Sequence, residues 1–115
     1  LPGPVTLLLP NPRRRFPLTG GELLGLRVID VGLELDLAVL QSSANRSGGP
    51  DPRRLADVPA AIRDGADLVL DGGQLPGVPS TVIDLGGYEL DGAWRVLRAG
   101  ALAPEAVAGA LRDRW

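Results

Sequence analysis

The chain has 115 residues, 44% of them apolar, which is enough for one small domain with a real core and argues against disorder. It contains no cysteine and no histidine, so disulfides, thiolate or imidazole metal sites and Ser-His triads are excluded. The basic residues are all arginine, and a net charge of −2 does not favour generic nucleic-acid binding.

No apolar run approaches the length of a membrane span. The chain begins at Leu1 and contains no methionine, so we expect a piece of a longer protein. Any catalysis must rest on arginine, carboxylates, hydroxyl and amide side chains, and backbone amides.

The first strand is predicted at Val5–Leu9, an apolar run bounded by two prolines. Residues 10–22 are rich in proline, arginine and glycine and are typical of a loop. A second strand is predicted at 24–29, with Arg27 in its middle. Residues 33–40 alternate like a strand but end in a continuous apolar run, so their structure stays open.

The middle of the chain is predicted to hold a short helical region followed by a strand. Asp51-Pro52 is typical of a helix start. Pro59 limits that helix to about one turn or begins a second one capped by Asp57, and Gly65 fits a helix end. Residues 66–70 are predicted to form a strand.

Two strands and a helix are predicted in the last third, at 81–85, 94–97 and from Pro104 onward. In that helix Val107, Leu111 and Trp115 share one face. The alternation of strands and short helices indicates an α/β (α+β) domain with a twisted, mixed β-sheet.

The segment SSANRSGG at 42–49 gathers small hydroxyl and amide side chains before a glycine pair. Such residues allow close approach of a ligand and can bind phosphate or carboxylate oxygens. They are equally typical of a turn with serine and asparagine caps, and composition alone favours the turn.

Arg27 is costly to bury unpaired between Leu26 and Val28. Either it faces solvent, or it faces a cleft and binds a carboxylate or phosphate through both of its amino groups. Ser80, Thr81 and Arg98 lie at predicted strand ends, where open α/β sheets gather ligands. Taken singly, each also fits an ordinary strand edge.

The motifs in sequence order are more specific. They resemble the C-terminal half of the YrdC/Sua5 family in PGPVT (2–6), LGLRV (24–28), SSANRSG (42–48), DGG (71–73), PSTVIDL (79–85) and VLRAG (96–100). The resemblance implies a twisted, mixed sheet that forms a deep concave site. It also implies that residues 1–115 are the C-terminal part of a single, incomplete YrdC-like domain.

The resemblance implies that the protein makes threonylcarbamoyl-AMP from ATP, L-threonine and bicarbonate, with Mg²⁺ on the phosphates. The product would serve the threonylcarbamoyladenosine (t6A) modification of tRNA, in the cytoplasm, with tRNA-modification partner proteins and away from membranes. No covalent nucleophile on the enzyme and no protein-bound metal are implied.

The resemblance also assigns residues to the two larger substrates. Arg27 would bind the threonine carboxylate, with Gln41 and Ser80 beside the amino acid. The residues implied to contact ATP are Leu23, Ser43, Asn45, Asp51 and Arg98.

The family's N-terminal segments, among them a Lys-x-Arg pair that would bind the triphosphate, have no counterpart here. We therefore expect the 115-residue piece alone to be inactive. Two alternatives remain: a double-stranded RNA-binding module, and a carbamoyl-transfer domain of the kind found in hydrogenase maturation factors.

Overall fold

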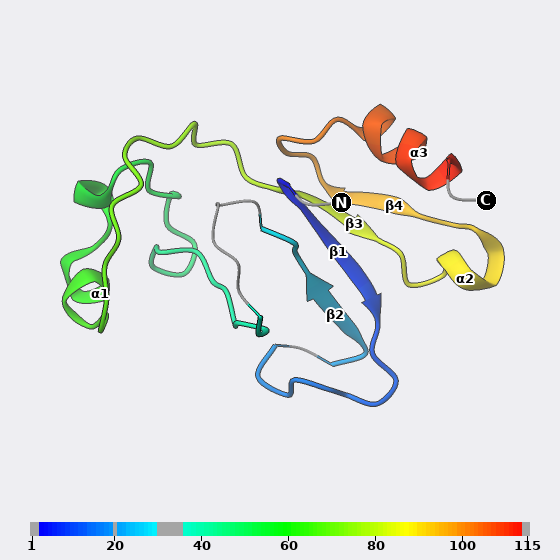
Figure 1. The fold of residues 1–115 in the computed structure, drawn as a ribbon, viewed down its shortest axis with the longest axis horizontal. Coiled ribbons are helices and arrows are strands. Elements are labelled where there is room, and N and C mark those ends of the chain that lie inside the picture. Colours follow the sequence, from blue (N-terminus) through cyan, green and yellow to red (C-terminus); the bar gives the residue numbers. More distant parts are fainter. Residues whose placement is uncertain (1–2, 20, 30–35, 114–115) are drawn as a thin grey trace. The chain divides into compact units, whose positions relative to one another are not determined.

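A computed structural model of the chain describes residues 3–19, 21–29 and 36–113. Their elements are β1 (Val5–Pro10), β2 (Leu23–Leu26), the 3₁₀-helix η1 (Leu55–Asp57), α1 (Ala60–Asp64), β3 (Thr81–Asp84), α2 (Tyr88–Asp91), β4 (Arg95–Arg98) and α3 (Pro104–Arg112) (Figure 1). The chain divides into two compact units, one from Leu1–Leu37 with Val78–Trp115 and one from Ala38–Gly77. All four described strands belong to the first unit.

The first unit is built on a mixed sheet with the strand order β2-β1-β3-β4. β1 runs parallel to β3 and antiparallel to β2, and β3 pairs antiparallel with β4 across a bulge at Val82/Ile83. Parallel neighbours need a long crossover, and the chain between β1 and β3 carries both β2 and the second unit. The predicted mixed α/β sheet with short helices is confirmed.

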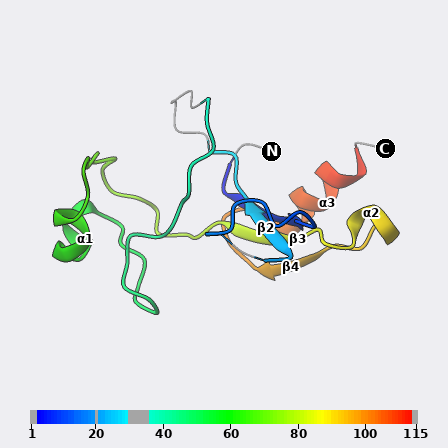
Figure 2. The same ribbon diagram turned by 90° about the horizontal axis from the view of Figure 1, so that it is seen from below.

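One face of this sheet forms the core of the first unit. Val5 and Ile83 face it from the two central strands, and Val107 of α3 packs against them with 1% of its surface exposed. Figure 2 shows α3 lying along this side of the strands. Pro104 fits the first turn of α3, and the four-residue spacing of Val107 and Leu111 turns both toward the sheet.

The opposite face of the sheet, here called the open face, carries several polar side chains. Side chains alternate along a strand, so Thr6 and Leu8 lie opposite to Val5 and Leu7. Gly25 lies on the same side, since a Cβ atom there would be 3.6 Å from Thr6 Cγ2. Both α2 and α3 pack toward the core face, through Tyr88 and Val107.

The loop between β1 and β2 is organised by the buried Asn11. Its Oδ1 accepts a hydrogen bond from the Arg15 backbone N–H at 3.0 Å, and its Nδ2 donates to the carbonyls of Arg15 and Gly21. Residues 13–18 are exposed on this loop, and the predicted loop at 10–22 is confirmed, apart from Pro10 in β1, for the residues that the structure describes.

Two predicted strands differ from the structure. β2 ends at Leu26 rather than at Ile29, so Arg27 follows the strand instead of lying in its middle. Residues 66–70 form no strand: Leu68 and Leu70 are 75% and 73% exposed, and none of the described strands pairs with them. A strand needs a neighbour to satisfy its backbone groups, which an apolar run alone cannot supply.

A short helical region is present in the middle of the chain, but the predicted caps Asp51 and Asp57 were wrong: Arg54 and Pro59 precede the two helices, and neither makes a side-chain cap hydrogen bond. The region after Asp51 begins as a 3₁₀-helix at Leu55, and Pro59 then precedes α1, which Gly65 ends as predicted. The four-residue helix α2 was not predicted. Residues 33–35 and Trp115 lie outside the described residues, and 36–40 have no regular structure.

α3, with nine residues, is the longest helix in the described ranges, well below the length that a membrane-spanning helix requires.

Candidate functional site

Each described strand brings one polar side chain to the same end of the open face. Thr6 lies near the start of β1, and Ser80 directly precedes the parallel β3. Arg98 ends β4, and Arg27 directly follows β2, both of which run the other way. With the observed strand order, these residues form a line, here called the polar row: Arg27, Thr6, Ser80 and Arg98.

The centre of the polar row is a hydrogen-bonded cluster around Ser80, which is 9% exposed. Arg98 donates to the Ser80 carbonyl from Nε at 3.1 Å and from Nη2 at 2.9 Å, and Nη2 also donates to Ser80 Oγ at 3.1 Å. Thr6 Oγ1 lies 3.1 Å from the same Ser80 Oγ. Arg98 therefore fixes the position of the Ser80 hydroxyl, and the two N–H donors on Arg98 Nη1 take no part in these bonds.

The backbone around Ser80 is held by the chain that follows β4. The Ala101 N–H donates to the Pro79 carbonyl at 2.9 Å. Thr81 Oγ1 donates to the Leu102 carbonyl at 2.7 Å and accepts the Leu102 N–H at 3.0 Å. Thr81 is fully buried on the core face, so its hydroxyl has a structural role and the neighbouring Ser80 faces the site.

Arg27 reaches the polar row because the backbone stays extended beyond β2, where the Gly3 N–H donates to the Val28 carbonyl at 3.0 Å. Two residues beyond Gly25, Arg27 returns to the open face and is exposed. The exposure fits the solvent-facing reading as well as the ligand-binding one.

Leu23 lies at the other end of β2, four residues or about 13 Å along the strand from Arg27. A Cβ atom on Gly86 would lie 3.3 Å from Leu23 Cδ2, so this side chain neighbours the end of β3 and is not part of the polar row.

The other predicted site residues belong to the second unit, residues 38–77. Gln41, Ser43 and Asp51 are exposed there, and Asn45 is half-buried. Asn45 Nδ2 donates to the Gly49 carbonyl at 2.8 Å, and Gly48 has φ of 75°. Asn45 therefore closes a turn, as the turn interpretation predicted, and its Oδ1 takes no part in that bond.

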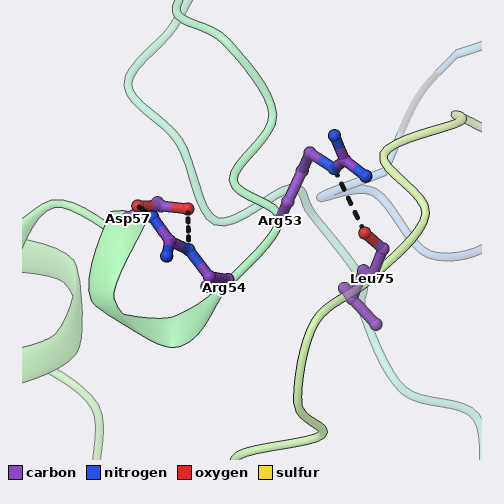
Figure 3. Close-up of polar contacts among 4 residues, drawn as sticks. All are labelled: Arg53, Arg54, Asp57 and Leu75. Carbon is purple, nitrogen blue, oxygen red and sulfur yellow. Dashed lines mark hydrogen bonds and ion pairs between the residues drawn. The ribbon is translucent and has the colours of Figure 1, made fainter.

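A further contact in the second unit joins the chain after Asp51 to residue 75 (Figure 3). Leu75 N–H donates to the Arg53 carbonyl at 2.7 Å, and Arg53 Nε donates back to the Leu75 carbonyl at 3.2 Å. The neighbouring Arg54 instead pairs with Asp57 at 3.1 Å. The two arginines thus differ: Arg54 lies in an exposed ion pair, and Arg53 fastens two chain segments.

A cavity of about 260 Å³ lies at the far end of β3 from Ser80, lined by Asp84, Gly87, Ala93, Trp94 and Arg95. Asp84 is engaged already: Oδ1 accepts the Gly86 N–H at 2.8 Å, and Arg95 Nη2 lies 2.9 Å from Oδ2. The Gly86 hydrogen bond, followed by that from Arg95, holds the Asp84 pKa below its usual range. We take the polar row as the candidate functional site, because its hydroxyl and guanidinium groups still have donors outside their mutual bonds.

Within the described ranges, no three histidine, cysteine or acidic side chains come together as a metal site. The site residue that the sequence did not reveal is Thr6. Thr6 belongs to the PGPVT motif, so the sequence did contain a signal for it. Only its hydrogen bond to Ser80 shows that it lies in the same cluster.

Comparisons with known proteins agree with these motifs. The sequence profile of the Sua5/YciO/YrdC family, described as "Telomere recombination", matches residues 1–100. A protein named threonylcarbamoyl-AMP synthase from Chromohalobacter salexigens is 43% identical over 94 residues, covering 73% of this chain and 50% of that protein. The chain thus spans about half the length of the curated relative it matches. No solved structure matches the chain. Because the profile covers most of the sequence, the chain belongs to the Sua5/YciO/YrdC family.

Proposed function

We propose that the intact protein carrying this chain is an L-threonylcarbamoyladenylate synthase, which forms threonylcarbamoyl-AMP from ATP, L-threonine and bicarbonate. The polar row carries this proposal. A free amino acid presents a carboxylate, which arginine and hydroxyl donors bind well. Family membership and the name of the similar bacterial protein support the same choice.

The proposed reaction needs no nucleophile from the protein. The threonine amine and bicarbonate give N-carboxythreonine and water. An oxygen of the new N-carboxylate (carbamate) group attacks the α-phosphorus of ATP, the P–O bond between the α-phosphorus and the oxygen that bridges to the β-phosphate breaks, and pyrophosphate leaves. Magnesium enters with the substrate as Mg·ATP. The protein accelerates the reaction by positioning the reactants and stabilising charge.

In this proposal the residues have separate tasks. Arg27 binds the threonine carboxylate, and Ser80 and Gln41 contact the amino acid. Arg98 holds the Ser80 hydroxyl in place and directs its Nη1 donors toward the nucleotide. The other proposed ATP contacts are Leu23, Ser43, Asn45 and Asp51, with Asn45 offering the Oδ1 that its turn leaves unused.

The test is a direct assay of the intact protein with ATP, L-threonine, bicarbonate and Mg²⁺. We expect pyrophosphate release that depends on threonine and bicarbonate, together with threonylcarbamoyl-AMP detected by mass spectrometry. Pyrophosphate release that ignores threonine, or none at all, would contradict the proposal. In the cell, the unstable acyl-adenylate would pass in the cytoplasm to proteins that modify tRNA.

A second candidate, double-stranded RNA binding, is favoured by the exposed loop that carries Arg13, Arg14 and Arg15. A gel shift with duplex RNA at several salt concentrations tests it. Binding through phosphates weakens steeply with salt. Replacing the three arginines by glutamine should then abolish the shift and leave adenylate synthesis unchanged.

A further inference from the structure

We infer that Thr6 is a substrate-contacting residue of the amino-acid site and that its hydroxyl acts as a pair with that of Ser80. The inference rests on the proposed function, because it takes L-threonine as the ligand that Arg27 and Ser80 share.

The strand order makes Thr6 the residue between those two. Arg27 follows β2 and Ser80 precedes β3, with β1 between them. Neighbouring strands lie about 4.8 Å apart, and the register sets Ser80 two residues from the level of Arg27, so their backbones are roughly 12 Å apart. The pairing of Leu7 with Leu26 places Thr6 beside Arg27, one step further along the register. Thr6 thus lies beside Arg27 on one side and within 3.1 Å of the Ser80 hydroxyl on the other, so a small ligand that touches both Arg27 and Ser80 comes close to Thr6.

The hydroxyl hydrogens of Thr6 and Ser80 favour a ligand with an oxygen acceptor, because the two hydroxyl groups have one more hydrogen than their mutual bond uses. Arg98 Nη2 can only donate, so Ser80 Oγ accepts that bond, 3.1 Å long. Thr6 and Ser80 share a second bond of 3.1 Å, in which either hydroxyl can donate. If Thr6 donates, the Ser80 hydrogen is free; if Ser80 donates, the Thr6 hydrogen is free. In both arrangements one O–H remains for a carboxylate or hydroxyl oxygen of the amino acid.

The neighbourhood of Thr6 also has room for a ligand on the open face. Gly25, which follows Leu24 on the adjacent strand, has no side chain and is exposed. A Cβ atom there would lie 3.4 Å from Leu8 Cδ2 and 3.6 Å from Thr6 Cγ2, ordinary contact distances. The amino-acid side chain can thus occupy the space beside the methyl groups of Thr6 and Leu8.

A purely structural role for Thr6 predicts a different result. If its hydroxyl only joins β1 to β3, removing it lowers the melting temperature and leaves ligand affinity unchanged. Melting temperature and threonine affinity therefore have to be measured on the same variants.

The experiment uses calorimetry of L-threonine binding to the intact protein, which does not depend on turnover. Thr6→Val keeps the shape and removes the hydroxyl, and we expect the dissociation constant to rise roughly tenfold, equivalent to about 1.4 kcal/mol. Thr6→Ser keeps the hydroxyl and should stay within about threefold of wild type. In a double-mutant cycle, Thr6→Val with Ser80→Ala should cost less than the sum of the two single changes.

Wild-type affinity in Thr6→Val would overturn the inference, whatever its melting temperature. Should Thr6→Val not fold, Gly25→Ala tests the same place: it should fold, and the added methyl group should weaken threonine binding at least fivefold. Unchanged binding there would refute the inference. Absence of threonine binding by the wild type would overturn both the inference and the proposed function. Threonine binding without adenylate synthesis would overturn the function alone.

Discussion

Gly100 shows how one residue controls the position of Ser80. A Cβ atom at Gly100 would collide with the Pro79 carbonyl oxygen and would lie 2.5 Å from Ser80 C and 2.6 Å from Thr81 N. These are backbone atoms, so no side-chain rotation can relieve the contact. The glycine is required by close approach of two chain segments rather than by its own dihedral angles.

We therefore expect Gly100→Ala to lower the free energy of unfolding by about 1–3 kcal/mol, as measured by urea denaturation of the intact protein. Threonine affinity should fall as well, because Ser80 is displaced. Gly109→Ala is the matched control: nothing lies within 4 Å of its Cβ position in α3, so it should be neutral or stabilising by up to about 1 kcal/mol. Equal effects of the two changes would contradict this account.

Replacing Arg27 tests whether this end of the polar row binds the amino acid. If it binds the threonine carboxylate, Arg27→Ala removes a charge-assisted bond of about 1.5–3 kcal/mol and raises the threonine KM by roughly one to two decades. The ATP KM should change far less. Arg112→Ala, at an exposed position in the last turn of α3, serves as the control. An unchanged threonine KM would return Arg27 to the solvent-facing interpretation.

At the scale of elements, Asp84 fastens the end of β3 to the following turn and to β4. The Gly86 N–H and then Arg95 lower its pKa in the folded protein, relative to about 3.9 in an unfolded chain. A lowered pKa contributes stability that is fully present above the pKa of the unfolded chain, and this stability is lost as the pH falls through the pKa of the folded protein.

We accordingly expect the free energy of unfolding to fall below about pH 4, with a smaller fall in Asp84→Asn. Urea denaturation between pH 3 and pH 7 measures both. Asp57→Asn is the control: the pKa of Asp57 is also lowered, first by its hydrogen bond with Arg54, but this pair is exposed and contributes little. If Asp57→Asn reduced the loss of stability at low pH as much as Asp84→Asn does, the assignment of that loss to Asp84 would be wrong.

For the turn at 43–49 the sequence left two roles open, a turn and a nucleotide site, and we expect both. Asn45 closes the turn through Gly49, so Asn45→Ala should cost about 0.5–2 kcal/mol of stability and also weaken ATP binding. Ser43 is exposed, so Ser43→Ala should lower ATP affinity about tenfold and leave the melting temperature almost unchanged. Calorimetry with ATP, well below the melting temperature, separates these effects. Wild-type ATP affinity in Ser43→Ala would assign the segment to a turn alone.

At the scale of the whole molecule, the two units differ in how they are held together. The first has a buried core of Val5, Ile83, Leu85 and Val107. The second, residues 38–77, has no buried residue, although it carries exposed apolar side chains such as Leu40, Leu68 and Leu70. Apolar side chains on a segment without its own core indicate that it needs further chain to pack against.

We expect residues 1–115 alone to release no pyrophosphate from ATP, threonine, bicarbonate and Mg²⁺. The chain spans about half of its curated relative and contains no lysine, and the Lys-x-Arg segment implied to hold the triphosphate is not part of it. The intact protein, assayed in parallel, is the positive control. Turnover above background by the 115 residues would show that they hold a complete active site.

The sequence by itself determined the strands β1, β3 and β4 to within a residue, and the start of the helix α3. Val5–Leu9 and 81–85 are apolar runs set off by proline and glycine, and Pro104 begins an amphipathic pattern, so local signals sufficed. The motif order likewise identified the family. Residues 66–70 carried a strand signal of the same kind and failed, because strand formation depends on a neighbour that a local pattern does not contain.

Only the tertiary structure decided which polar residues lie together. Arg27, Thr6, Ser80 and Arg98 are far apart in the chain and come to one end of the open face because β2 and β4 run antiparallel to the central pair. Register and strand direction are properties of the sheet and set which side chains share a face. The bonds from Arg98 and Thr6 to Ser80 follow from that register, which is why the resemblance of motifs could name Ser80 and could not reveal Thr6.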